Sequence, residues 1–280
     1  MRLVRLANGQ EVPALGLGTW RMGEKQSARS AEIAAVKLAI EIGYRLLDTA
    51  EMYGDGGAEE VVGAAIAAAG RRRDELTVVT KVLPSNASRD SVLRACERSL
   101  KRLALDSIDL YLLHWRGSTP LKETVAAFEQ LRADGRIRHW GVSNFDTADM
   151  KQLWALTGGR GCVANQVYYA ASERGAEFDL LPWQRDHDVV TMAYSPIDQG
   201  ALAADATFAT IGRRHRVSAS TAALAWVLRH PEVIAIPKAV KEPHLRENYL
   251  AAQLELTADD LAQIDEQFPP PKRKRPLATT

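Results

Sequence analysis

The sequence has few of the residues that hold metal sites, disulfide frameworks or membrane spans. Its 280 residues include two cysteines, Cys96 and Cys162. They form neither a CxxC pair nor a cluster with histidine at metal-ligand spacing, so we expect no metal and no disulfide framework. No apolar run approaches the ~20 residues that cross a bilayer. The first residues also lack the apolar segment of a signal peptide, which favours a cytoplasmic protein.

The sequence also lacks an excess of charge of either sign. Lysine and arginine number 36 against 35 aspartates and glutamates, a formal net charge of +1. The balance gives no indication of a nucleic-acid partner, and we expect a monomer that binds small molecules. The tail at residues 268–280 is the local exception, because a proline run there precedes four basic residues. A nuclear or nucleic-acid tag is one interpretation, and a solvated tail that lies across the fold is the one we favour.

A regular alternation of short apolar runs and helical patterns fills most of the chain. The apolar runs predict eight strands, at residues 14–18, 45–49, 76–81, 109–114, 138–144, 162–166, 189–195 and 232–238. Runs that are apolar throughout are typical of strands buried on both faces of a parallel sheet. Helical periodicities lie between them, one ended by Gly43 and another opened by Ser88.

Eight strand–helix units in under 300 residues predict a closed (β/α)8 barrel rather than an open sheet. We expect residues 1–280 to form one such domain, with 268–280 as its tail. The segment before the first strand contains the turn signal Asn8-Gly9. It predicts a β-hairpin that caps the bottom of the barrel.

Polar residues stand where the apolar runs end. They are Asp48, Lys81, His114, Ser143, Asn144, Gln166, Tyr194, Ser195 and Lys238. Active sites of (β/α)8 barrels collect at the carboxyl ends of the strands, so we expect these side chains to share one bowl. Asp48 and Lys81 follow adjacent strands and should pair, because an isolated buried charge costs several kcal/mol. A salt bridge with no further role is the alternative interpretation of this pair.

Tyr53 and His114 favour a chemical role for the pair. Tyr53 lies five residues beyond Asp48, in the stretch "LLDTAEMYG", so its hydroxyl can turn back over the bowl. We expect the ammonium of Lys81 to lower the phenol's pKa of about 10 and to make it a competent proton donor. A neutral His114 can donate a hydrogen bond to a developing alkoxide. The four groups together predict protonation of a carbonyl oxygen, with Asp48 holding Lys81 in its charged form.

A carbonyl reductase needs a hydride donor, yet no GxGxxG follows any predicted strand, and "GLGTW" at 16–20 is only a lone GxG. Ser143, Asn144 and Gln166 offer partners for a carboxamide, and the ring of Tyr194 offers a face for a nicotinamide. Lys238 and Lys241 precede a short helix expected near Pro243, which would suit a ribose phosphate. A solvated surface charge is the alternative for Lys238.

The chain resembles the aldo-keto reductase family over nearly its whole length. The similar motifs are "GYRLLDTAEMYG" (43–54), "VVTKV" (78–82), "DLYLLHW" (109–115), "GVSNF" (141–145), "NQVYY" (165–169), "AYSP" (193–196) and "IPK" (236–238). Each motif is short, but they occur in the family's order. The resemblance implies a barrel that binds NADPH in extended form, with Tyr53 as general acid, His114 as substrate orienter, and Lys81 and Asp48 lowering the pKa of the tyrosine.

The resemblance also implies two sets of binding residues. The cofactor would contact Gly18, Thr19, Trp20, Asp48, Ser143, Asn144, Gln166, Tyr194, Ser195, Pro196, Ile236, Pro237, Lys238, Ala239, Val240, His244, Glu247 and Asn248. The substrate would contact Trp20, Tyr53, His114 and Trp115. Two positions depart from the family pattern, since Ala239 replaces a common serine and His244 a common arginine. NADPH stays favoured through Lys238, while use of NADH stays open.

The substrate pocket is less well defined by the sequence. Trp20, Trp115 and Trp183 can form apolar walls around a carbonyl, although Trp183 can equally pack between loops. The tail is short compared with family members whose C-terminal loop closes over the substrate, which predicts an open pocket for small aldehydes and α-dicarbonyls. The chain is similar in this respect to bacterial members that reduce methylglyoxal. The predicted function is therefore NADPH-dependent reduction of aldehydes and ketones to alcohols.

Two other classes of function stay open. One is a barrel that binds NADP(H) but acts as a redox-sensing or regulatory subunit with little turnover. The other is a lyase that uses Lys81 as a Schiff-base amine. Such a lysine works in its neutral form, whereas a paired Asp48 would keep Lys81 protonated.

Overall fold

The computed structural model describes residues 2–7, 9–70 and 72–279. Eight parallel strands form the centre of the molecule: β3 (Leu17–Gly18), β4 (Leu46–Asp48), β5 (Thr77–Val82), β6 (Ile108–Leu113), β7 (Ile137–Ser143), β8 (Cys162–Tyr168), β9 (Val190–Tyr194) and β10 (Val233–Ala235). They lie side by side in chain order from β3 to β10. Parallel bridges from Leu15 to Ala235 and from Gly18 to Lys238 join the two edges. The predicted (β/α)8 barrel is confirmed.

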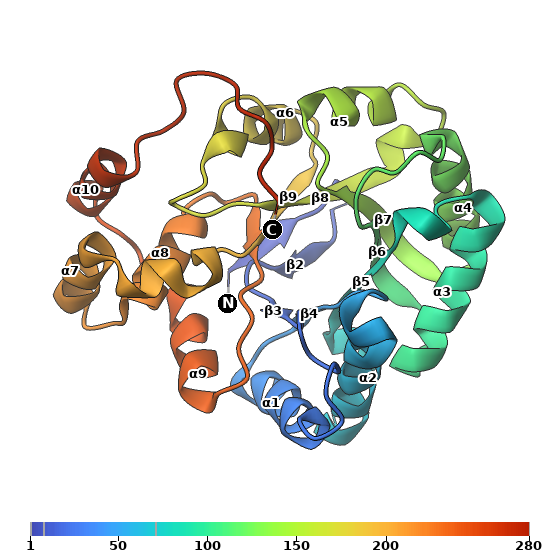
Figure 1. The fold of residues 1–280 in the computed structure, drawn as a ribbon, viewed down its shortest axis with the longest axis horizontal. Coiled ribbons are helices and arrows are strands. Elements are labelled where there is room, and N and C mark those ends of the chain that lie inside the picture. Colours follow the sequence, from blue (N-terminus) through green and yellow to red (C-terminus); the bar gives the residue numbers. More distant parts are fainter. Residues whose placement is uncertain (1, 8, 71, 280) are drawn as a thin grey trace.

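The helices surround this ring of strands (Figure 1). They are α1 (Arg29–Ile42), α2 (Gly57–Ala69), α3 (Arg89–Leu103), α4 (Leu121–Ala133), α5 (Thr147–Trp154), α6 (Leu180–Asp186), α7 (Ala206–His215), α8 (Ala219–Val227), α9 (Glu242–Ala251) and α10 (Ala258–Gln267). Their ends follow local sequence signals. Gly43 ends α1 at a φ of 129°, a conformation that favours glycine. Asp146 opens α5 by accepting hydrogen bonds from the backbone N–H groups of Ala148 and Asp149.

The strands are buried on both faces, as their apolar sequences predict. Every residue of β6 is buried, because side chains on one face fill the barrel interior while those on the other pack against helices. The core includes large aromatic side chains such as Trp140, Tyr111 and Phe128. Cys96 and Cys162 are also buried, and burial raises the pKa of each thiol to about 12. Both cysteines are therefore unreactive packing groups at neutral pH.

A β-hairpin closes the end of the barrel where the strands begin. Strands β1 (Leu3–Arg5) and β2 (Glu11–Pro13) pair antiparallel, and Val4 lies opposite Val12. The N–H of Leu6 donates to the carbonyl of Gln10 at 2.8 Å across the connection. The predicted hairpin is confirmed, while Asn8 of its turn signal lies outside the described residues.

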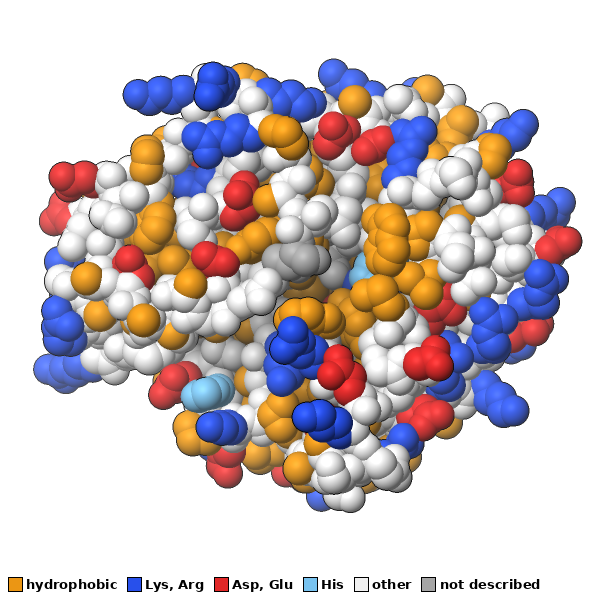
Figure 2. Space-filling view, viewed as in Figure 1, with side chains coloured by type: hydrophobic (Ala, Val, Ile, Leu, Met, Phe, Trp, Pro, Cys, Tyr) orange, Lys and Arg blue, Asp and Glu red, His pale blue; other side chains and the backbone are white. Residues whose placement is uncertain are grey.

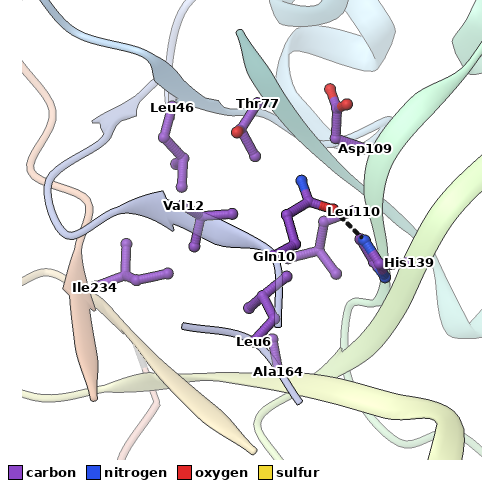
Figure 3. A pocket seen from close by; sticks show the side chains of 10 residues that line it. All are labelled: Leu6, Gln10, Val12, Leu46, Thr77, Asp109, Leu110, His139, Ala164 and Ile234. Carbon is purple, nitrogen blue, oxygen red and sulfur yellow. Dashed lines mark hydrogen bonds between the residues drawn. The ribbon is translucent and has the colours of Figure 1, made fainter. Parts of the chain in front are cut away.

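The hairpin leaves almost no space beneath the strands (Figure 3). Leu6 and Val12 face Leu46, Ala164 and Ile234 around a cavity of about 10 Å³, which holds at most one water molecule. The side chains of Gln10 and His139 are 2.7 Å apart at its edge. This end of the barrel is a packed plug, so a ligand site has to lie at the opposite end.

The chain after α10 returns across the molecule toward the centre of the barrel (Figure 1). Arg174 holds its start, with its guanidinium donating to the carbonyl of Phe268 and to Asp265. Lys274 lies 3.1 Å from Asp179, and Leu277 packs against the core. Within the described ranges, none of the helices is both long and apolar enough to span a bilayer.

Candidate active site

A cavity of about 1050 Å³ opens at the carboxyl end of the barrel. Figure 2 shows this face hollowed near its centre, with hydrophobic side chains around the hollow. Its volume is at the upper end of the ~300–1,000 Å³ typical of ligand pockets. Fifteen of the predicted cofactor residues line it, namely Gly18, Trp20, Asp48, Ser143, Asn144, Gln166, Tyr194, Ser195, Pro196, Ile236, Pro237, Lys238, His244, Glu247 and Asn248. The predicted substrate residues Trp20, Tyr53, His114 and Trp115 line it as well.

The predicted pair of Asp48 and Lys81 is present at the floor of the cavity. The ammonium of Lys81 donates to Asp48 Oδ2 at 2.8 Å and to the carbonyl of Thr49 at 2.8 Å. It also lies 5.0 Å from the centre of the Tyr53 ring. Lys81 is fully buried, and burial is the largest single effect and disfavours its charge, but Asp48 and Tyr53 together outweigh burial and raise the pKa of Lys81. A lysine kept protonated in this way is unsuited to Schiff-base chemistry.

The tyrosine differs from the sequence-based expectation in one respect. Burial raises the pKa of Tyr53 above its ordinary value of 10.0, and this effect is larger than the lowering by Lys81. Asp48 raises the same pKa, since a carboxylate disfavours a nearby phenolate. The prediction that Lys81 lowers the pKa of Tyr53 below its ordinary value is therefore wrong. Lys81 offsets part of the desolvation, and Tyr53 stays a protonated phenol at neutral pH.

His114 completes the group beside Tyr53. The two ring centroids are 5.8 Å apart and nearly perpendicular, and the Trp115 ring lies 4.9 Å from the His114 ring. Burial, assisted by the charge of Lys81, lowers the pKa of His114 to about 3. The imidazole is thus neutral at physiological pH, as the sequence analysis requires, and a neutral imidazole can donate one hydrogen bond.

Two loops in close backbone contact fix the position of Tyr53. Tyr53 begins a short 3-10 turn, Tyr53–Gly56, that packs on the loop after β3. A Cβ atom added to Gly54 would lie 2.7 Å from the carbonyl carbon of Gly23, and one added to Gly23 would lie 2.2 Å from that of Gly57. Both contacts are too short for any side chain, so glycine is required at this crossing. The loop that carries Trp20 and the loop that carries Tyr53 therefore form one unit.

Glu51 ties the same loop to the end of β5, a role that the sequence analysis missed. Its Oε1 accepts hydrogen bonds from the N–H of Leu83 at 2.7 Å and from the Asn86 amide at 3.0 Å. The side chain is buried although it carries a carboxyl group. The available signal was a glutamate two residues before Tyr53, inside the recognised motif at 43–54.

The three predicted carboxamide partners form one hydrogen-bonded chain with Asp48 and the His114 carbonyl. Gln166 Nε2 donates to Asp48 Oδ1 at 2.8 Å, and the Ser143 hydroxyl donates to the Gln166 carbonyl at 2.8 Å. Asn144 Nδ2 donates to the His114 carbonyl at 3.1 Å, and the Tyr194 hydroxyl donates to Asn144 Oδ1 at 2.9 Å. These bonds fix the amides, while all four side chains still border the cavity.

The far end of the cavity is suited to an anion. Lys238 and His244 line it and are exposed, and Asn248 lines it from α9. Three predicted cofactor residues, Thr19, Ala239 and Val240, do not line the cavity. The side chain of Thr19 is buried and donates to the Asp48 carbonyl at 2.9 Å, so it supports the floor.

The aromatic walls agree only in part with the sequence analysis. Trp20 and Trp115 line the cavity and are 39% and 38% exposed. Trp183 lies in α6, where its ring stacks on His187 at 4.0 Å and meets Trp154 edge to face. Trp183 therefore packs outside the cavity, in agreement with the alternative interpretation, although Trp183 and Trp154 lie on the helices α6 and α5 and not on loops.

The C-terminal tail also differs from the expectation of an open pocket. Thr279 lines the cavity, so the tail reaches the mouth of the barrel despite its short length. Sequence reasoning also missed other lining residues, namely Arg21, Met52, Arg116, Asp149, Ile197, Gln199, Gly200, Ala203 and Ser220. Most lie one to four residues beyond a recognised motif, and that proximity was the only local signal.

Comparisons with known proteins agree with this geometry. The model of the aldo/keto reductase family matches residues 14–267. The chain is 46% identical to methylglyoxal reductase YeaE of Escherichia coli, over 99% of this chain and 98% of the relative. It is 36% identical to glyoxal reductase of Bacillus subtilis, over 94% and 91%. A crystal structure of an aldo-keto reductase from Klebsiella pneumoniae in complex with NADPH is 46% identical, with a TM-score of 0.96 over 100% of this chain and 99% of that one. The chain belongs to the aldo/keto reductase family.

Proposed function

We propose that this protein is an NADPH-dependent reductase that converts small aldehydes and α-dicarbonyls, such as methylglyoxal, into alcohols. The observation that carries the proposal is the contact of Lys81 with both Asp48 and the Tyr53 ring, beside a neutral His114. The names of the relatives, methylglyoxal reductase and glyoxal reductase, support the substrate class. The NADPH complex of the Klebsiella pneumoniae protein supports the cofactor.

The residues present fit a nicotinamide dinucleotide. Asn144 and Gln166 border the cavity with amide groups, and Tyr194 offers a ring that is itself stacked on Tyr168 at 5.7 Å. Lys238 and His244 would hold the phosphate end. When bound there, NADPH supplies the hydride for the carbonyl carbon.

The protein's own groups handle the proton. Tyr53 donates its phenolic proton to the carbonyl oxygen of the substrate. The ammonium of Lys81 then stabilises the negative charge of the Tyr53 phenolate. His114 orients the same oxygen by a hydrogen bond. The high pKa of Tyr53 keeps the proton available at neutral pH, and the phenolate takes a new proton from solvent after turnover. Asp48 holds Lys81 charged throughout.

The decisive experiment replaces Tyr53 by phenylalanine, which removes the hydroxyl and keeps the ring. We expect Tyr53→Phe to reduce kcat for methylglyoxal by at least about a hundredfold, in line with loss of general acid catalysis. NADPH binding, followed by fluorescence, should be unchanged. Normal turnover in this variant would overturn the assignment of the acid. Absence of turnover with every aldehyde in the unaltered protein would instead support a regulatory NADP(H)-binding subunit.

A further inference from the structure

Positive charge at one side of the cavity mouth is left unexplained by the proposed reaction. Arg116 lines the cavity directly after His114 and Trp115. The tail that brings Thr279 to the cavity carries four consecutive basic residues, 272–275. Figure 2 shows Lys and Arg side chains gathered along the edge of this face where Figure 1 places the tail and α6.

The Arg116 guanidinium is held in place by one hydrogen bond, which occupies only one of its N–H groups. Its Nη1 donates to Asp149 Oδ1. Asp149 is in turn fixed in the first turn of α5, where its Oδ2 accepts from the Asp146 N–H at 3.4 Å. A guanidinium has five N–H donors, and no other contact of the Arg116 guanidinium is found among the described residues. The remaining donors form a planar fork that matches a carboxylate.

Arg116 follows His114 and Trp115, so it belongs to the side of the cavity where we expect the substrate and not to the side where we expect the cofactor phosphates. The Trp115 ring lies 4.9 Å from the His114 ring, and Arg116 lines the same cavity. A substrate held at Tyr53 and His114 that extends along Trp115 would therefore approach the side of the cavity that carries Arg116. Arg21, the other arginine that lines the cavity, lies on the loop after β3, and its guanidinium lies over the Trp20 ring, 4.5 Å from the ring centre. Arg21 is therefore held against an aromatic wall, whereas Arg116 is held by the carboxylate of Asp149.

We propose that the cavity prefers carbonyl compounds that carry a carboxylate group, which Arg116 binds while the carbonyl lies at Tyr53 and His114. This inference rests on the proposed reductase function and specifies its substrate class. The reaction itself is unchanged, because the carboxylate contributes only to binding and takes no part in the chemical step. A carboxylate on a guanidinium fork makes charge-assisted hydrogen bonds, which are about twice as strong as neutral ones.

The basic tail has a supporting part in this arrangement. Lys274 lies 3.1 Å from Asp179, and the hydrogen bond and charge of Asp179, with smaller effects from Asp146 and Asp149, raise the pKa of Lys274. The tail therefore offsets acidic groups that include Asp149, the partner of Arg116, and its other basic residues add a positive field. Such a field accelerates the capture of anionic substrates and weakens as salt is added.

The test compares matched acids and esters with the full-length protein at saturating NADPH. Succinic semialdehyde is compared with its methyl ester, and para-carboxybenzaldehyde with its methyl ester. We expect kcat/KM to be at least about tenfold higher for each acid, and the advantage to shrink with added salt. Arg116→Gln should lower kcat/KM for the acids by about ten- to hundredfold, mainly through KM, and leave the esters within about twofold. Arg116→Lys should restore part of the difference.

A control and a binding measurement keep the test decisive. Arg94→Gln removes an exposed arginine of α3 whose only hydrogen-bond partner among the described residues is Ser91, and it should leave the acid-to-ester ratio unchanged. Trp115 borders the site, so succinate should quench tryptophan fluorescence in the unaltered protein and not in Arg116→Gln. Equal kcat/KM for acid and ester, or equal losses for both in Arg116→Gln, would overturn the carboxylate preference alone. Failure to reduce any acid or ester would overturn the reductase function instead, and the quenching titration would still decide the carboxylate site.

Discussion

Lys81 Nζ lies 2.8 Å from Asp48 Oδ2, and both side chains are almost completely buried beneath the Tyr53 ring. Two opposite charges that are both buried interact strongly, but each is costly if its partner is lost. The pair thus keeps a positive charge beside a phenol that would otherwise be hard to ionise.

Removal of the lysine should therefore affect stability as well as catalysis. Lys81→Met leaves Asp48 buried without its cation and should lower the free energy of unfolding by about 3–5 kcal/mol. The double variant Asp48→Asn, Lys81→Met removes both charges and should recover much of that loss. Turnover should be absent in both. Urea denaturation with kinetics checks this, and strictly additive losses would show that the two side chains are not coupled.

The pH dependence follows from two groups. The proposed mechanism requires a protonated Tyr53 and a neutral His114 for reduction. The pKa of His114 is lowered to about 3, and that of Tyr53 is raised above 10.0. His114 therefore loses its proton well below neutral pH, and Tyr53 keeps its own above it. We expect kcat for reduction to be flat from about pH 5 to pH 9. Alcohol oxidation needs the phenolate and should rise throughout that range. A break in the reduction profile near pH 6.5, checked with His114→Gln, would show that His114 titrates normally.

The preference for NADPH should depend on Lys238. This side chain is exposed at the far end of the cavity, whereas Lys241 does not line it. Lys238→Ala should raise KM for NADPH about tenfold or more and change KM for NADH little, because only NADPH carries the additional phosphate. Lys241→Ala is the matched control and should have a smaller effect. Equal increases for both cofactors would argue against a phosphate contact.

The tail should define one wall of the substrate site. A chain ended after Pro269 keeps Phe268, whose ring stacks on Phe208 and whose carbonyl accepts from Arg174. It loses Leu277, Thr279 and the ion pair of Lys274 with Asp179. We expect the truncated protein to fold, to bind small aldehydes with higher KM, and to accept bulkier ones. Lys274→Gln should reproduce a fraction of the change. An unaltered substrate profile would show that the tail does not contact the substrate.

Much of the barrel and of its polar floor was predictable because both follow from local pattern. Apolar runs identified all eight strands, and their last residues identified Asp48, Lys81 and His114 as neighbours. Gln166 and Ser143 were identified in the same way. Residues on irregular segments, such as Arg21 and Gln199, were missed because no period relates such a residue to the space that it borders.

The order of strands and the residues at their carboxyl ends were determined by the sequence alone, since the side-chain pattern of a buried parallel strand is local. Tertiary structure decided three other features: the upward shift of the Tyr53 pKa, the position of the tail at the mouth of the cavity, and the ion pair that holds Arg116 to Asp149. Each depends on distances between segments far apart in the chain. For Tyr53, burial raises the pKa and the charge of Lys81 lowers it. Both effects depend on the distances between groups, so their balance is set only in the folded protein.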